Sequence, residues 1–152
     1  MTEITSLFSK SARQKGFDMK PEQINKVLVI DDSEFDRRMI VSAMKSVCGD
    51  VTCVELSSGA AVLETMRNEH PQLTIVDIRM PGISGWEVLE RIRADSSLRK
   101  LNVVMMSGSS SELDIEKATE FGAHGFYTKP HTRLDYGAVA TDLKTNFLDQ
   151  AA

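Results

Sequence analysis

The sequence predicts an α/β protein in which a parallel sheet is covered by helices on both faces. Five short runs rich in apolar and β-branched residues alternate with five longer segments whose apolar residues recur every three or four positions. Regular alternation of this kind favours parallel strands joined by right-handed helical crossovers. The 152 residues suit one domain with a short appendage.

Each expected strand is a run of four or five residues, most of them apolar. These strands cover residues 26–30, 51–55, 73–77, 103–106 and 125–128. Short runs of this kind read as buried strands.

Each strand is followed by a segment with helical spacing. Ser33 and Ser84 can cap the first and third helices, Ser58 precedes the second, and the fourth is expected over residues 113–121. Some apolar residues are expected to face the core from the first and last helices. They are Phe35, Met39, Ile40, Ala43, Met44 and Val47, and Leu134, Val139, Leu143 and Phe147.

Composition narrows the range of functions. A net charge of −4 without a basic stripe argues against direct binding of nucleic acid. No run approaches the roughly 18 apolar residues of a membrane span, and the N-terminus lacks an apolar signal core. Cys48 and Cys53 lack the spacing of a metal site and are expected to be reduced thiols. We therefore expect a cytoplasmic protein.

Residues 1–25 differ from the rest of the chain. Ile4, Leu7 and Phe8 have helical spacing, but polar and charged residues then interrupt the apolar face. This extension is either a tail or short helix, or a docking segment for a partner or a second copy. The domain itself is expected over residues 26–150.

Charged side chains follow three of the predicted strands. Asp31 and Asp32 follow the first strand, Asp77 ends the third, and Lys129 follows the fifth. The carboxyl ends of parallel strands line one crevice, so these side chains are expected to meet there. At about 4 Å each pair of carboxylates repels by roughly 4 kcal/mol. A divalent cation is the expected compensation, with one carboxylate left free to react.

Four motifs then suggest a family. They are VLVIDDS, TIVDIRMPGISGWEVLERIR, VVMMSGSSS and GAHGFYTKP, with 30 positions from Asp77 to Ser107 and 22 from Ser107 to Lys129. In order and spacing they resemble the receiver domain of bacterial two-component response regulators, of the stand-alone, chemotaxis-regulator-like type, over about residues 26–150. The resemblance implies a flavodoxin-like, doubly wound sheet of five parallel strands in the order 2-1-3-4-5.

The resemblance also implies a phosphoacceptor and a metal site. Asp77 is in the place of the aspartate that accepts a phosphoryl group. Asp31 and Asp32 match the acidic pair that binds Mg²⁺ together with Asp77, and Arg79 is in the place that supplies a backbone carbonyl to the metal. Oxygen ligands of this kind suit Mg²⁺.

Two further matches concern the phosphoryl group and its signal. Ser107 resembles the hydroxyl residue that bonds a phosphoryl oxygen, and Lys129 the cation that pairs with it. Ser107 and Phe126 are in the places of a two-residue switch. Phe126 departs from the tyrosine frequent in the family, so its rotation would be driven by packing alone.

Taken together, these features predict a single-domain response regulator without an output domain. It would take a phosphoryl group from a sensor histidine kinase or a histidine phosphotransfer protein and signal through a noncovalent partner. Its last two helices and fifth strand would form the binding surface, and phosphorylation could also drive dimerisation. The domain would catalyse only the phosphorylation and dephosphorylation of its own Asp77.

Other functions stay open at this stage. Within the family, the chain could be a phosphorelay intermediate or a phosphate sink. A phosphohydrolase of the haloacid-dehalogenase type also uses an aspartyl phosphate and Mg²⁺, but it needs a second acid two residues after the nucleophile, where Arg79 stands. A binding module that has lost phosphorylation is disfavoured by the full acidic set with Ser107 and Lys129.

Overall fold

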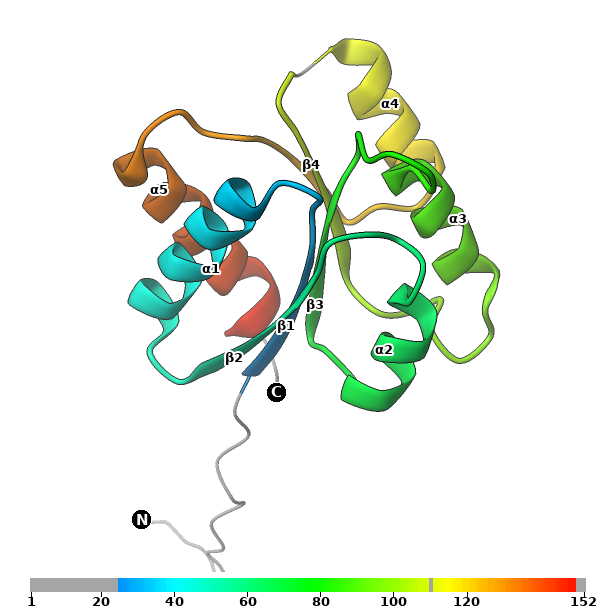
Figure 1. The fold of residues 1–152 in the computed structure, drawn as a ribbon, viewed down its shortest axis with the longest axis horizontal. Helices are drawn as coiled ribbons and strands as arrows, with labels where there is room; N and C mark the ends of the chain where they lie inside the picture. Colours follow the sequence, from blue (N-terminus) through cyan, green and yellow to red (C-terminus); the bar gives the residue numbers. More distant parts are fainter. Residues whose placement is uncertain (1–24, 110, 150–152) are drawn as a thin grey trace, which may run out of the picture.

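The computed structural model describes residues 25–109 and 111–149. Most of the expected N-terminal extension, residues 1–24, lies outside this part of the chain. Five parallel strands form one sheet in the order β2-β1-β3-β4-β5, which confirms the predicted topology (Figure 1). The strands are β1 (Asn25–Ile30), β2 (Val51–Leu56), β3 (Leu73–Asp77), β4 (Val103–Ser107) and β5 (Gly125–Thr128).

Helices cover both faces of the sheet (Figure 1). They are α1 (Glu34–Cys48), α2 (Val62–Glu69), α3 (Gly85–Ala94), α4 (Glu112–Glu120) and α5 (Arg133–Leu143), and a π-helical turn, η1 (Lys144–Leu148), continues α5. One core cluster joins α1 and α5 to the sheet, and a second joins α2, α3 and α4 to the opposite face. The sheet is therefore the middle layer of three.

Side chains of the central strands alternate between the two cores. Val27 and Val29 of β1 belong to the cluster under α1 and α5, whereas Leu28 and Ile30 belong to the other. All five residues of β3 are buried. Because each face of the sheet is covered, these strands read as continuous apolar runs rather than as alternating ones.

Ser33 and Ser84 cap α1 and α3, as predicted. The hydroxyl of Ser33 accepts a hydrogen bond from the backbone N–H of Asp36 at 3.2 Å, and Ser84 does the same for Glu87 at 3.3 Å. The second helix differs from the expectation, because α2 begins at Val62 after Ala61 and has no side-chain cap. Ser58 lies in the loop before it.

Two residues that we expected in the core are exposed. Phe35 in α1 is 70% exposed and Leu134 in α5 is 84% exposed, so these two predictions are wrong. Both residues lie in the first turn of their helix. Helical spacing identifies which side of a helix is apolar but not where the neighbouring sheet ends, so it cannot tell a covered first turn from an uncovered one.

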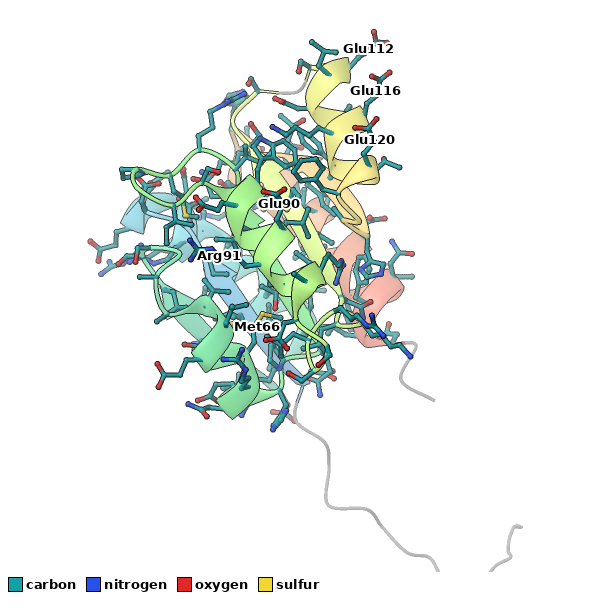
Figure 2. The ribbon with its side chains drawn as sticks, turned by 90° about the vertical axis from the view of Figure 1, so that its right-hand side faces the viewer. Met66, Glu90, Arg91, Glu112, Glu116 and Glu120 are labelled. Atoms are coloured by element: carbon teal, nitrogen blue, oxygen red, sulfur yellow. The ribbon has the colours of Figure 1, made fainter. Side chains whose placement is uncertain are left out.

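The outer face of α4 is acidic. Glu112, Glu116 and Glu120 follow one another along the helix and point away from the sheet (Figure 2). Leu113 is 76% exposed on the same helix, and Ala118 is its buried residue. This helix is held to the sheet by little apolar contact. None of the helices in the described ranges is long and apolar enough to cross a membrane.

Candidate functional site

Pairing of the strands brings the predicted site residues to one edge of the sheet. β1 and β3 are neighbours, with Ile30 opposite Val76, so Asp31 and Asp77 leave their strands side by side. On the other side of β3, Ser107 ends β4 opposite Thr128 of β5. Lys129 follows directly, and its backbone N–H donates to the carbonyl of Ser107 at 2.7 Å.

Asp31, Asp32 and Asp77 form a compact acidic cluster. Each offers a carboxylate oxygen, and these oxygens lie within 4.8 Å of one another. Asp31 and Asp77 are buried, while Asp32 is exposed at the mouth of the site. A set made only of carboxylate oxygens, one side of it open to water, suits a hard divalent cation that keeps part of its hydration shell. The cluster could therefore hold such an ion.

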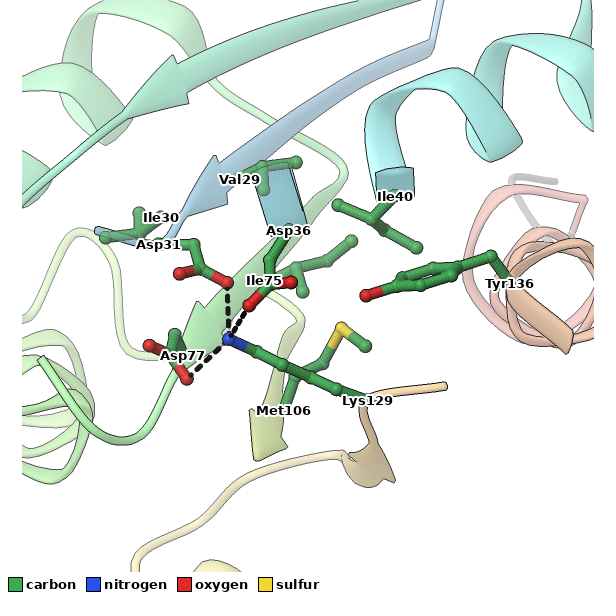
Figure 3. Close-up of a pocket in the computed structure, with 10 residues that line it drawn as sticks. All are labelled: Val29, Ile30, Asp31, Asp36, Ile40, Ile75, Asp77, Met106, Lys129 and Tyr136. Atoms are coloured by element: carbon green, nitrogen blue, oxygen red, sulfur yellow. Dashed lines mark hydrogen bonds and ion pairs between the residues drawn. The ribbon is translucent and has the colours of Figure 1, made fainter. Parts of the chain in front are cut away.

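The ammonium group of Lys129 lies among three carboxylates (Figure 3). Its Nζ atom lies 2.8 Å from Asp31 Oδ2, 2.9 Å from Asp36 Oδ2 and 3.2 Å from Asp77 Oδ1. The lysine side chain is only 14% exposed. A buried ammonium has three protons to donate, and here it finds three acceptors.

These contacts shift the pKa of both central groups. Burial, followed by the charge of Asp31, raises the pKa of Asp77 to about 6, although Lys129 opposes this. Burial alone would lower the pKa of Lys129, but hydrogen bonds to Asp31 and Asp36 and the charges of Asp31 and Asp77 raise it. Lys129 is thus a cation at neutral pH, and any further positive charge would favour the carboxylate form of Asp77.

Ser107 ends β4, and Phe126 lies in β5, three residues before Lys129. Ser107 is fully buried, and its hydroxyl accepts a hydrogen bond from the N–H of Ser109 at 3.3 Å. Phe126 pairs with Met105 in the sheet and packs, half-buried, against the core on the α4 side. The two predicted switch residues therefore lie on adjacent strands.

The side chain of Arg79 turns to α4. It donates to Asp114 Oδ2 at 3.0 Å, while Arg79 itself is 63% exposed. The loop after β3 is thereby linked to the first turn of α4. The predicted role of Arg79 concerns its backbone carbonyl and does not depend on this contact.

The backbone around Asp77 is held by a close approach of Gly85. The N–H of Gly85 donates to the carbonyl of Ile78 at 2.9 Å. A Cβ atom at position 85 would come within 2.3 Å of the carbonyl oxygen of Asp77 and 2.7 Å of Ile78 Cα. Glycine is thus required where α3 begins, because its hydrogen atom lets the helix approach the end of β3.

Asp36 is a member of the site that sequence reasoning missed. It lies in the first turn of α1 and, with Ile40 and Tyr136, lines the side of the pocket next to that helix (Figure 3). Ile40 is buried and four residues later, and residues four apart share a face of a helix. This spacing could have indicated that Asp36 points inward rather than to solvent.

The fold and the site together define a phosphoaccepting signalling domain. A buried carboxylate, a cluster suited to a divalent cation and a lysine surround one small space at the carboxyl edge of the sheet. Phosphoryl transfer requires such positioning and neutralisation of oxygen charge. The family model described as the response regulator receiver domain matches residues 27–137, and the chain belongs to that family. Such domains are typically signalling modules rather than enzymes.

Individual response regulators are similar to this chain in sequence or in structure. The two-component response regulator ORR11 of Oryza sativa is 36% identical over 105 residues, which cover 68% of this chain and 70% of that protein. The phosphorylated cyanobacterial phytochrome response regulator RcpA superposes with a TM-score of 0.77 at 23% identity, over 86% of this chain and 98% of its own. The Mn²⁺-bound form of response regulator Rcp1 gives a TM-score of 0.73 at 23% identity, over 84% and 97%. At such identities the two structures support the fold alone.

Proposed function

We propose that this chain is a response regulator that accepts a phosphoryl group on Asp77 and signals through a separate protein. The donor is a phosphohistidine of a sensor kinase or a phosphotransfer protein. The observation that carries the proposal is that the buried Asp77 carboxylate contacts the ammonium of Lys129 at 3.2 Å, and that Asp31 contacts the same ammonium at 2.8 Å. Membership of the receiver family supports a histidine kinase as the upstream partner.

In the proposed reaction, a carboxylate oxygen of Asp77 bonds to phosphorus as the bond from phosphorus to the histidine nitrogen breaks. Lys129 then pairs with one oxygen of the transferred group and the Ser107 hydroxyl donates to another. A divalent cation held by Asp31, Asp32, Asp77 and the carbonyl of Arg79, proposed to be Mg²⁺, supplies further positive charge to these oxygens. Attack of water on the same phosphorus, with cleavage of its bond to the Asp77 oxygen, would release phosphate and return the chain to its starting state.

The proposed signal is a change in population between two conformations. When Ser107 turns to the phosphoryl oxygen, Phe126 rotates into the space it leaves. Phe126 has no hydroxyl to bond in either position, so the change in packing must favour one rotamer. Moving such an equilibrium from 1:99 to 99:1 needs about 5.5 kcal/mol, to which binding of a partner can contribute.

The proposed output surface consists of α4, β5 and α5. Exposed Leu113 and Leu134 give it apolar contacts, and Glu112, Glu116 and Glu120 give it negative charge. These features favour a protein partner, or a second copy of the domain, over nucleic acid. The domain organisation that we propose is a receiver over residues 26–150 preceded by an N-terminal extension.

Phosphorylation with a small donor tests the proposal. Wild type treated with phosphoramidate and Mg²⁺ should gain the mass of one phosphoryl group, and Asp77→Asn should gain none. Asp50→Asn, which changes an exposed acid at the amino edge of the sheet, is the matched control and should be labelled like wild type. Equal labelling of Asp77→Asn would reject Asp77 as the acceptor.

A relay role within the same family is tested by following transfer of the phosphoryl group in the reverse direction. A phosphorelay intermediate should return its phosphoryl group to a phosphotransfer histidine as readily as it takes it. Phosphorylated chain is therefore mixed with the unphosphorylated phosphotransfer protein, and label is followed in both. Rapid transfer back to the histidine favours the relay or sink, and slow loss to water favours a terminal regulator.

A further inference from the structure

A fourth carboxylate takes part in the site. We propose that Asp36 is a positioning residue that holds the ammonium of Lys129 so that Asp31 and Asp77 can turn their oxygens to a divalent cation. The inference rests on the proposed function and deepens it. It assigns a task to a residue that lies outside the acidic cluster of Asp31, Asp32 and Asp77.

The ammonium and a cation compete for the same oxygens. Lys129 Nζ contacts Asp31 and Asp77, which are two of the three carboxylates that could hold the ion. Positive charges so close together repel, and each takes ligands that the other needs. Asp36 resolves the competition because its hydrogen bond to Lys129, at 2.9 Å, uses no oxygen of the cluster.

The first turn of α1 fixes Asp36 relative to the cluster. The backbone N–H of Ser33 donates to Asp31 Oδ1 at 2.9 Å, and the hydroxyl of Ser33 accepts from the N–H of Asp36 at 3.2 Å. Arg37 donates to the carbonyl of Asp31 at 2.7 Å. The helix N-terminus also stabilises the negative charge of Asp36. These hydrogen bonds hold Asp31 and Asp36 in one turn, so Asp36 offers Lys129 an acceptor at a fixed position.

Replacing Asp36 should weaken the binding of Mg²⁺. In Asp36→Asn the ammonium keeps only Asp31 and Asp77 as charged partners and competes with the cation more strongly. We expect the dissociation constant for Mg²⁺ to rise about three- to tenfold, in the range of coupling between residues that touch. Asp36→Glu keeps the charge and should restore most of the affinity.

Calorimetric titration of the full chain with Mg²⁺ measures this directly. Glu34→Gln is the matched control, because it removes one negative charge from the same turn but from an exposed residue paired with Arg38. It should bind Mg²⁺ nearly as wild type does. The same Asp36→Asn change is also made in a Lys129→Met background. In that background the loss of Mg²⁺ affinity caused by Asp36→Asn should be smaller, because Asp36 acts through the lysine.

A second readout follows the lysine itself. The ¹⁵N signal of the Lys129 ammonium should be observable in wild type with Mg²⁺ and should broaden by exchange with water in Asp36→Asn. Wild-type affinity in Asp36→Asn, a loss no larger than in Glu34→Gln, an equal loss in Asp36→Glu, or an undiminished loss without the lysine would each overturn the inference. Failure of wild type to be labelled by phosphoramidate would instead reject the proposed function.

Discussion

Asp77 carries an electrostatic cost while no cation is bound. The side chain is buried beside Asp31, and its pKa of about 6 lies above the ordinary value of 3.8. When folding raises the pKa of a carboxyl group, ionisation of that group lowers the free energy of unfolding. Asp77 is thus placed where its charged form is disfavoured, and Lys129 offsets only part of this cost.

Asp77→Asn should therefore stabilise the metal-free protein at neutral pH. Below about pH 3 Asp77 is protonated in both folded and unfolded chains, so the variant should gain little there. As the pH rises through 4 to 6, wild type loses stability and the variant does not. The gain near pH 7 should be on the order of 1–3 kcal/mol.

Urea unfolding in the presence of a chelator, repeated between pH 4 and 8, measures this gain. Asp50→Asn, which changes an exposed residue and leaves Asp77 in place, is again the control, and its stability should fall with pH as that of wild type does. A gain that stays constant over this range would contradict the raised pKa of Asp77. A loss of stability at pH 7 would mean that the ion pair with Lys129 outweighs the cost of burial.

At the scale of elements, the start of α3 is the most constrained junction. Gly85 lies against the backbone of Asp77 and Ile78, with no room for a Cβ atom. Ser84 caps the helix one residue earlier, so the chain cannot easily move its start. The end of β3 and the start of α3 thereby position the acceptor together.

Gly85→Ala should be strongly destabilising. Overpacking against backbone atoms cannot be relieved by a change of rotamer, and we expect a cost of roughly 3 kcal/mol in the free energy of unfolding. Gly137→Ala in α5 is the opposite case, because no atom lies within 4 Å of the added methyl group. It should stabilise by about 0.5–1 kcal/mol through helix propensity.

Denaturant midpoints of the two variants, compared with wild type, test this contrast. Phosphorylation of Gly85→Ala by phosphoramidate should also slow, since the carbonyl and carboxylate of Asp77 move together. Gly137→Ala should be labelled at the wild-type rate. Equal stability of the two variants would show that α3 can shift away from β3 at little cost.

Over the whole molecule, two cores meet at the sheet and the site lies at one edge of it. β1, which Asp31 follows, and β3, which ends at Asp77, are inner strands with apolar neighbours on both faces. The acidic cluster therefore lies at the carboxyl ends of strands that are held from both faces. Binding of a cation there should raise the free energy of unfolding of the whole domain, because the site forms only in the folded chain.

Mg²⁺ at about 100 times its dissociation constant should add about 2.7 kcal/mol to the free energy of unfolding. For a domain of this size the melting temperature should rise by about 5–10 °C. Calorimetric melting with and without Mg²⁺, at matched ionic strength, provides the measurement. Asp32→Asn removes the exposed ligand from the cluster and should lose most of the increase. An equal increase in that variant would place the stabilising cation elsewhere.

The sequence by itself determined the order and type of the elements and the ends of the strands that carry charge. Short apolar runs and apolar residues that recur every three or four positions are local patterns, so the five strands and five helices could be predicted from them. Asp31, Asp77 and Lys129 could be predicted to lie at one edge of the sheet, because the carboxyl ends of parallel strands meet there. Their roles in phosphorylation rest on family resemblance and stay predictions.

Only the tertiary structure decided which side chains touch. Asp36 and Lys129 are 93 positions apart, and their hydrogen bond depends on how the first turn of α1 and the segment after β5 meet at the carboxyl edge of the sheet. The ion pair of Arg79 with Asp114 and the exposure of Phe35 and Leu134 depend likewise on where helices lie over the sheet. A local pattern fixes the face that a side chain occupies. What that face meets is set by the packing of elements distant in sequence, which no local pattern contains.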